Sequence, residues 1–160
     1  DDSFFNRFAS LLKLSPVFFP LACPDSRLAP VYIGDVVEAL CRAIDNATAG
    51  ERLDLCGPEV FTLQQLVEYT RDQVGSHCRI VGLGDGLSRL QAHVLGLVPG
   101  KPFTMDNYHS LQVPATCDNN ALPEIGIQPV SVGAVVPGYL AGHSARGRYP
   151  GLRRHARRAR

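Results

Sequence analysis

The strongest constraint on the fold is a sharp change of pattern within the stretch RLAPVYIGDVVEAL, residues 27–40. A short apolar run at residues 29–33 stops at Gly34, and Asp35 then opens a stretch with apolar residues at helical spacing. The run predicts a strand. Asp35 predicts the N-cap of a helix, where its carboxylate complements the helix dipole. Such a strand-to-helix junction is typical of α/β proteins.

The same alternation continues along the chain. Short apolar patterns at residues 52–57 and 78–83 predict two further strands, whereas residues 15–26 contain three prolines and are expected to be irregular or edge-like. Amphipathic patterns predict helices in five other segments: residues 4–14, 62–74, 86–98, 104–112 and 131–140. Three short strands are too few for a complete doubly wound sheet, which usually has about five or six. The fold class is therefore α/β with an incomplete sheet.

Local capping signals support two of these helices. Thr62 stands three residues before Gln65, which is the spacing of a capping box, and Gly75 follows as a C-terminal cap. Thr104 is placed to cap the helix at residues 104–112.

Charge is distributed unevenly. The chain has 16 Lys and Arg against 15 Asp and Glu, but seven arginines lie in residues 146–160, which contain no acid, so nine basic and fifteen acidic side chains precede them. Residues 141–160 are therefore predicted to be an Arg-rich mobile tail behind a body of residues 1–140. We expect the tail to be simply solvated, or to bind an anionic membrane surface or an acidic partner. Nucleic acid is disfavoured, because only Tyr149 is interleaved with the arginines.

The cysteine pattern favours neither a zinc site nor a disulfide framework, because the number is odd and no CxxC pair occurs. Cys41 and Cys56 lie in apolar segments and are expected to be small core residues. The first residues also lack the pattern of a signal peptide. Together these features predict a reducing, cytoplasmic compartment.

Several catalytic motifs are absent. Gly82, Gly84 and Gly86 are spaced GxGxG instead of GxGxxG, which predicts a glycine-rich connector leading into a helix. No GxSxG occurs, and the histidines show no metal-binding spacing, so no metal site is expected. Neither Lys13 nor Lys101 has a tyrosine four residues before it, so the Tyr-x-x-x-Lys pair of short-chain dehydrogenases is missing.

Three blocks in order, FFNRFASLLKLSPVFF, APVYIGDVVEAL and LDLCGPEVFTLQQLVEY, carry a family resemblance. They resemble the C-terminal part of the extended and atypical short-chain dehydrogenase/reductases, in the NAD-dependent epimerase/dehydratase group. Within that group the chain is most similar to bacterial relatives of the nucleotide-binding accessory subunit of respiratory complex I. The later stretch GKPFTMDNYHSLQV fits the same subfamily.

The resemblance implies a Rossmann-type NAD(P)-binding fold followed by a smaller substrate-binding subdomain. In that family the glycine-rich loop and the Tyr/Lys pair lie in the N-terminal half, so this chain is identified as the C-terminal, substrate-side segment at residues 1–140. Its partner would be the N-terminal Rossmann half of a parent chain. NAD or NADP is expected in that parent, and neither is expected to bind this chain alone, which would be inactive by itself.

The resemblance also suggests three substrate-binding residues. Arg27 and Tyr32 would face a substrate, and Arg27 would pair with the phosphate of a nucleotide sugar or another small molecule. Asp35 would hold the strand end near the site. The alternatives are a surface arginine, a packing tyrosine and a simple N-cap.

The resemblance leaves the overall function open between classes. The parent can be an NAD(P)-dependent oxidoreductase or sugar-nucleotide epimerase. It can instead be a non-catalytic nucleotide-binding module that stabilises a membrane-associated respiratory complex, peripheral to the inner membrane. A third interpretation is a redox-inactive remnant, which should expose apolar surface where the missing sheet belonged.

Overall fold

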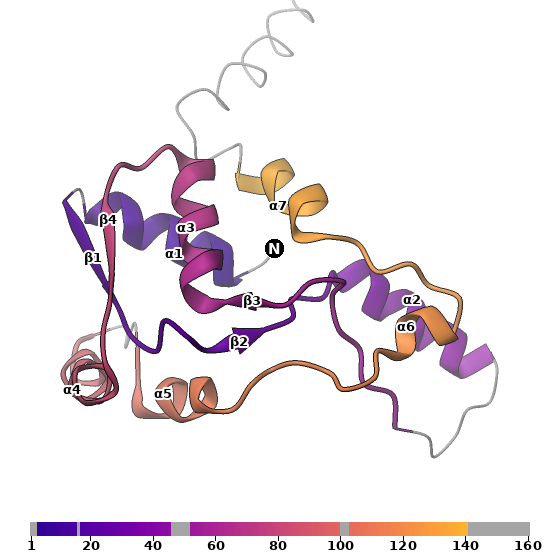
Figure 1. Cartoon of the computed structure of the whole chain (residues 1–160). Helices are drawn as coiled ribbons and strands as arrows, with labels where there is room; N and C mark the ends of the chain where they lie inside the picture. Colours follow the sequence, from indigo (N-terminus) through magenta and orange to yellow (C-terminus); the bar gives the residue numbers. More distant parts are fainter. Residues whose placement is uncertain (1–2, 16, 46–51, 100–102, 141–160) are drawn as a thin grey trace, which may run out of the picture.

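The structure, a computed structural model, describes residues 3–15, 17–45, 52–99 and 103–140 (Figure 1). The Arg-rich stretch at residues 141–160 lies outside the described residues. The described part is α/β, and its parallel sheet is small and incomplete, which confirms the predicted fold class.

The parallel sheet consists of β1 (Phe18–Leu21) and β4 (Arg79–Gly82). Helices α1 (Ser3–Leu14) and α3 (Leu63–Val74) pack on it through one buried cluster. The members of that cluster are Leu12, Leu21, Leu63, Val67 and Cys78. The strand predicted at residues 78–83 is therefore confirmed as β4. Strand β1 lies within the proline-rich stretch that was expected to be irregular or edge-like.

A second, antiparallel pair joins β2 (Arg27–Leu28) to β3 (Phe61–Thr62), and Ala115 bonds to β2 from another segment. The strand predicted at residues 29–33 is wrong, because β2 ends at Leu28 and Ile33 already begins the next helix. The N–H of Ala29 still donates to the carbonyl of Ala115, but Pro30 has no N–H with which to extend a ladder.

The following helix, α2 (Ile33–Asp45), begins before the predicted cap. Asp35 therefore lies inside the first turn and is not the N-cap. Its carboxylate Oδ2 instead accepts the N–H of Val130 at 2.8 Å, and the Asp35 residue is 5% exposed. A carboxylate in this position still complements the helix dipole.

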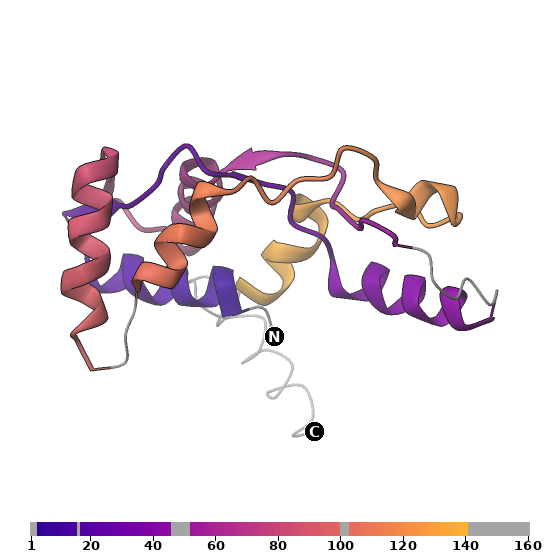
Figure 2. The same cartoon turned by 90° about the horizontal axis from the view of Figure 1, so that it is seen from below.

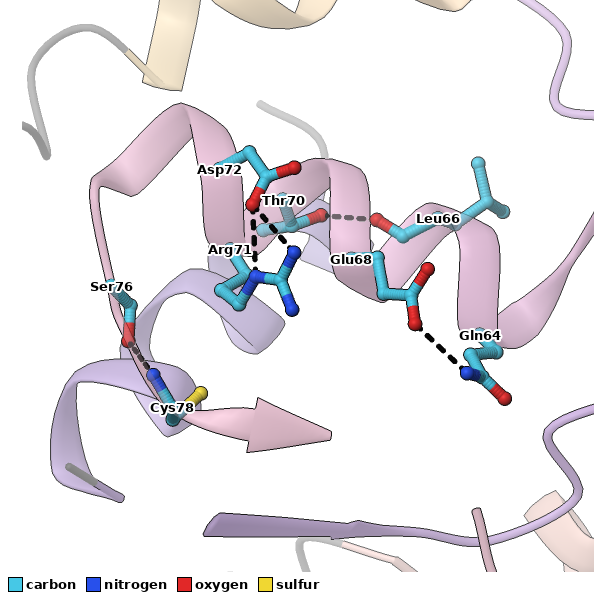
Figure 3. Close-up of polar contacts among 8 residues, drawn as sticks. All are labelled: Gln64, Leu66, Glu68, Thr70, Arg71, Asp72, Ser76 and Cys78. Atoms are coloured by element: carbon cyan, nitrogen blue, oxygen red, sulfur yellow. Dashed lines mark hydrogen bonds and ion pairs between the residues drawn. The ribbon is translucent and has the colours of Figure 1, made fainter. Parts of the chain in front are cut away.

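Helix α3 has the caps that its sequence predicts. The side chains of Thr62 and Gln65 form a reciprocal capping box, and Gly75 closes the helix with a left-handed φ of 69°. Figure 3 shows the buried Thr70 turned back along α3, where its Oγ1 donates to the Leu66 carbonyl at 2.7 Å. A buried hydroxyl is thus satisfied within its own helix.

The remaining helices are α4 (Asp85–Gly96), α5 (Met105–Gln112), α6 (Ala121–Glu124) and α7 (Val132–Leu140). Thr104 caps α5 as predicted. Helix α7 packs with α1 and α3 in a cluster that includes Phe5, Leu66 and Val136. Helices α4 and α2 lie at opposite ends of the molecule in Figures 1 and 2. Among the described residues, no helix combines the length and apolarity needed to cross a membrane.

The cysteine prediction is wrong in two respects. Cys56 and Cys117 form a disulfide with a Cα–Cα distance of 6.1 Å, and Cys41 is exposed instead of lying in the core. Of the two cysteines expected to lie in the core, Cys41 and Cys56, only Cys56 is buried. Because the chain contains a disulfide, its cysteines no longer favour a reducing compartment.

The strand predicted at residues 52–57 is also wrong, because this segment has no strand partner within the described residues. Its backbone instead makes isolated bonds, from the Gly57 N–H to the Ala29 carbonyl at 3.3 Å and from the Ala121 N–H to the Asp54 carbonyl at 3.0 Å, and bonds to one side chain. Asn120 Oδ1 accepts the N–H of Cys56 at 3.3 Å, and Asn120 Nδ2 donates to the Cys56 carbonyl at 2.8 Å. The amide therefore takes the place of a neighbouring strand and brings the two cysteine-bearing segments together.

Removing the disulfide by the double change Cys56→Ser and Cys117→Ser should lower the free energy of unfolding by roughly 2–4 kcal/mol, because a long loop is no longer closed in the unfolded chain. Urea unfolding measures the effect, and a reductant should produce a similar loss in the wild type. Cys41→Ser, at an exposed position, should change the free energy of unfolding by less than about 0.5 kcal/mol. Titration of five free thiols in unreduced protein would contradict the disulfide.

Candidate functional site

A cavity of about 330 Å³, lined by both polar and apolar residues, lies at the carboxyl ends of the two parallel strands. Cys23 follows β1 and Leu83 follows β4, and both line it. Residues from the end of α5 complete the wall. The carboxyl ends of parallel strands are where open α/β sheets bind their ligands. This cavity, called the strand-end cavity below, is therefore the candidate site.

Asp85, at the start of α4, organises one wall of the strand-end cavity. Its Oδ1 accepts the Tyr108 hydroxyl at 2.6 Å and the Gln112 side-chain amide at 3.3 Å. The hydrogen bond to the Asp85 carboxylate raises the pKa of Tyr108 above its ordinary value of 10.0, and burial and the negative charge add to the rise. Tyr108 thus remains a neutral donor near neutral pH.

Cys23 stands between the strand end and α4. Its backbone has a φ of 49°, in the left-handed region that is uncommon for residues other than glycine. The N–H of Cys23 donates to Ser88 Oγ at 3.1 Å, and that hydroxyl donates in turn to the Leu83 carbonyl. Burial raises the pKa of the Cys23 thiol, although hydrogen bonds from Ser88 and Gln112 oppose the rise. A protonated thiol is a weak nucleophile, so the cavity does not present an activated cysteine.

Ser26 and Arg27 supply polar groups from the segment between β1 and β2. Ser26 is 8% exposed, and its Oγ has no hydrogen-bond partner among the described residues. A buried hydroxyl without a partner is unfavourable and is normally satisfied by water or a ligand. Arg27 is exposed and carries the cationic group of the lining, which also includes the acidic residues Asp25 and Asp85.

A second, larger cavity of about 940 Å³ is mainly apolar. It is lined by Phe4 and Phe5 of α1, by the segment leading into α2, and by residues of α7 such as Val136. Tyr32, which is 39% exposed, is among its lining residues. This lining suits an apolar group or an apolar protein surface better than a charged ligand.

The structure does not bring the three predicted site residues together. Arg27 lines the strand-end cavity, Tyr32 lines the apolar cavity, and Asp35 is buried against Val130 and lines neither. The sequence analysis missed Cys23, Ser26, Asp85 and Gln112. One signal could have found two of them, because Cys23 lies two residues after the end of β1 and Asp85 three residues after the end of β4.

The glycine-rich connector has the predicted role. Gly82 ends β4, Gly84 is the N-cap of α4, and Gly86 lies in the first turn of α4.

The histidines were expected to bind no metal; within the described residues, no cluster of His, Cys, Asp and Glu could hold a metal ion.

No protein-family model matches the chain, but a curated protein and solved structures are similar to it. The chain is 27% identical over 108 residues to the mitochondrial NADH dehydrogenase (ubiquinone) 1 alpha subcomplex subunit 9 of Arabidopsis thaliana, covering 61% of this chain and 27% of that protein. The resemblance to the short-chain dehydrogenase/reductase group is confirmed. The chain spans about a quarter of the length of this curated relative.

The fold is similar to that of a solved structure, the NADPH-dependent quinone oxidoreductase QOR2 of Escherichia coli in complex with NADPH. The TM-score is 0.58 at 19% sequence identity, and the match covers 85% of this chain and 50% of the oxidoreductase. At this identity the match shows the fold, which is of the Rossmann type.

Raising the pH above about 10 should destabilise the protein more than its Tyr108→Phe variant. The raised pKa means that folded Tyr108 keeps a proton that the unfolded chain releases. The contribution of the Tyr108 hydroxyl to the free energy of unfolding is therefore present below the ordinary pKa and is lost as the pH rises through the folded pKa. Urea unfolding between pH 8 and pH 11 measures the difference. Identical slopes for wild type and Tyr108→Phe would contradict the Tyr108–Asp85 bond.

Proposed function

We propose that the chain is the substrate-side segment of an NAD(P)-dependent epimerase-, dehydratase- or reductase-like protein. The observation that carries this proposal is the cavity at the carboxyl ends of β1 and β4, whose lining includes Arg27, Asp85 and Ser26. It occupies the position where Rossmann-type folds bind their ligands. NAD or NADP would be held by the parent's other half, because the sequence lacks the GxGxxG loop and the Tyr-x-x-x-Lys pair.

The lining of the strand-end cavity suits a substrate with both an anionic group and hydroxyl groups, such as a nucleotide sugar. Arg27 would pair with the phosphate by charge-assisted hydrogen bonds. Asp85 and the unpartnered Ser26 would bind hydroxyl groups. Tyr32 would contact an apolar part of the substrate from the second cavity, and Asp35 would act as a positioning residue by tying Val130 to α2.

The N-terminal Rossmann half of the parent would dock on α2. Four apolar side chains recur along one side of this helix and are 51–79% exposed: Ile33, Val37, Leu40 and Ile44. A row of this kind is unfavourable in water and is typical of a protein interface. This row, called the α2 row below, continues at Ile33 into the apolar cavity.

The substrate proposal predicts that the chain binds UDP-glucose weakly and binds neither NADH nor NADPH. Saturation-transfer NMR detects the first interaction and calorimetry tests the second. Arg27→Gln should weaken UDP-glucose binding about tenfold, because charge-assisted bonds to the phosphate are lost. Arg79→Gln is the matched control, since Arg79 is an exposed arginine at the opposite end of β4. Tight NADPH binding would place the cofactor loop in this chain, and equal effects of both substitutions would remove Arg27 from the site.

A second candidate function is a non-catalytic assembly module of a membrane-associated respiratory complex. The similarity to the Arabidopsis complex subunit favours it. The Arg-rich stretch would then contact an anionic surface at the periphery of the inner membrane, or an acidic partner.

Deleting residues 146–160 should reduce binding to vesicles that contain phosphatidylglycerol by tenfold or more at low salt, because seven positive charges are removed. Vesicle flotation measures the bound fraction, and neutral phosphatidylcholine vesicles are the control. Unchanged binding after the deletion would show that the Arg-rich stretch has no role at the membrane.

A further inference from the structure

The Cys56–Cys117 disulfide closes a ring of contacts at Ala29. The N–H of Ala29 donates to the Ala115 carbonyl at 2.9 Å, and the Ala29 carbonyl accepts the Gly57 N–H at 3.3 Å. Gly57 directly follows Cys56, and Ala115 lies two residues before Cys117. The disulfide therefore joins covalently the two segments that bond to Ala29. Thiol–disulfide exchange can break and re-form this bond.

The segment on the Cys56 side is held by contacts that do not need the disulfide. Asn120 Oδ1 accepts the N–H of Cys56, and Asn120 Nδ2 donates to the Cys56 carbonyl. Asn120 is itself fixed at the start of α6, where its Oδ1 also accepts the Leu122 N–H at 3.2 Å. Gly57 lies directly against Pro30, and a Cβ at position 57 would overlap the Pro30 carbonyl oxygen. These contacts hold the Cys56 side in place whether the disulfide is closed or open.

The segment on the other side, residues 113–118, has few contacts of its own. Within the part of the chain that the structure describes, both of its backbone hydrogen bonds are at Ala115. The Ala115 N–H donates to the Arg27 carbonyl at 2.9 Å, and the Ala115 carbonyl accepts the N–H of Ala29. None of its residues is a member of a buried apolar cluster in the described part of the chain, and Cys117 is only half-buried. The disulfide is therefore a main restraint on this segment.

Residues 113–118 also form part of the wall of both cavities. Pro114 lines the strand-end cavity, and Ala115 lines the apolar cavity. Leu111, which lies just before the segment, lines both. A displacement of residues 113–118 would therefore change the shape of the two cavities at once.

We propose that the Cys56–Cys117 disulfide is a redox switch, whose reduction releases residues 113–118 while the Cys56 side stays in place. The oxidised form keeps this part of the cavity walls ordered, and the reduced form loosens it. A disulfide can act as a switch where it biases a segment between an ordered and a disordered state. Here that segment is held between its ends by Ala115 alone once the bond is open. The inference does not depend on which substrate the strand-end cavity binds.

The reductant is a small thiol such as glutathione, and Cys117 carries the sulfur that it attacks. Cys56 is 8% exposed, whereas Cys117 is half-buried and more accessible. A glutathione thiolate forms a bond to Cys117 Sγ, the Cys56–Cys117 bond breaks, and Cys56 Sγ leaves as a thiolate that takes up a proton. A second glutathione thiolate then attacks the glutathione sulfur of the mixed disulfide. The products are two cysteine thiols and oxidised glutathione, so the two electrons come from the reductant.

NMR relaxation of the backbone amides of the full chain tests the proposal in the folded state. In the oxidised protein, residues 115–118 should have order parameters of about 0.85, the value of rigid backbone, and after reduction these should fall below about 0.6. The amides of α3 and of residues 56–57 should stay at the rigid value in both forms. Unchanged order parameters at residues 115–118 would overturn the proposal. So would a loss of rigidity throughout α3, because the disulfide would then only hold the fold together.

Two cysteine variants separate the disulfide from other effects of the reductant. Cys117→Ser cannot form the bond, so its residues 115–118 should be flexible before reduction and should not respond to glutathione. Cys41→Ser is the matched control, because Cys41 is an exposed free cysteine, and this variant should respond as the wild type does. Rigid residues 115–118 in Cys117→Ser would contradict the proposal. The measurement on reduced wild type does not depend on the folding of either variant.

Mass spectrometry tests the order of the chemical steps. Brief treatment with glutathione, followed by alkylation with N-ethylmaleimide, should place glutathione on Cys117 and the alkyl group on Cys56. Later addition of oxidised glutathione should restore the rigid order parameters, because a switch is reversible. Glutathione found mainly on Cys56, or a reduction that oxidised glutathione does not reverse, would each overturn the proposal.

Discussion

The arrangement depends on the backbone of residues 23–29, which leaves β1 and bonds to several other segments. The carbonyls of Pro24 and Ser26 accept the N–H groups of Gln64 and Leu63 at 3.0 and 2.8 Å. These are N–H groups of the first turn of α3, which have no partner inside the helix. The segment thus caps α3 with its own backbone and fixes where the helix begins relative to the sheet. The conformation of residues 23–29 is thus fixed by the N–H groups of Leu63 and Gln64, which need carbonyl partners outside the helix.

The same constraint creates two cavities instead of one. Once the segment is held by α3 on one side and by Ala115 on the other, Arg27 faces the strand ends, whereas Tyr32 follows beyond Pro30 and faces the space next to α7. Leu111 lines both cavities, so they share a wall although Arg27 and Tyr32 line different ones. The Ser26 carbonyl accepts the Leu63 N–H, and its hydroxyl is buried without a partner among the described residues.

Features that depend on neighbouring residues could be predicted from the sequence, and features that depend on distant ones could not. The capping box of Thr62 involves residues three positions apart, and it was found from spacing. Asp35 bonds to a residue 95 positions away, and Cys56 to one 61 positions away, so neither the true role of the carboxylate nor the disulfide follows from local pattern. The strand predicted at residues 52–57 failed for a similar reason, because its bonds go to distant groups: the Asn120 side chain and the backbones of Ala29 and Ala121. The incomplete α/β sheet was predictable because strand and helix periodicities alternate along the chain.

The exposed apolar side chains of α2 and α4 show how the same helical spacing recurs at opposite ends of the molecule (Figure 1). Leu87, Leu90 and Val94 of α4 have exposed fractions comparable to those of Val37 and Leu40 of α2. Beside the α2 row, Glu38 pairs with Arg42. This pairing suits contact with an apolar protein surface, because burying an unpaired charge there would be costly.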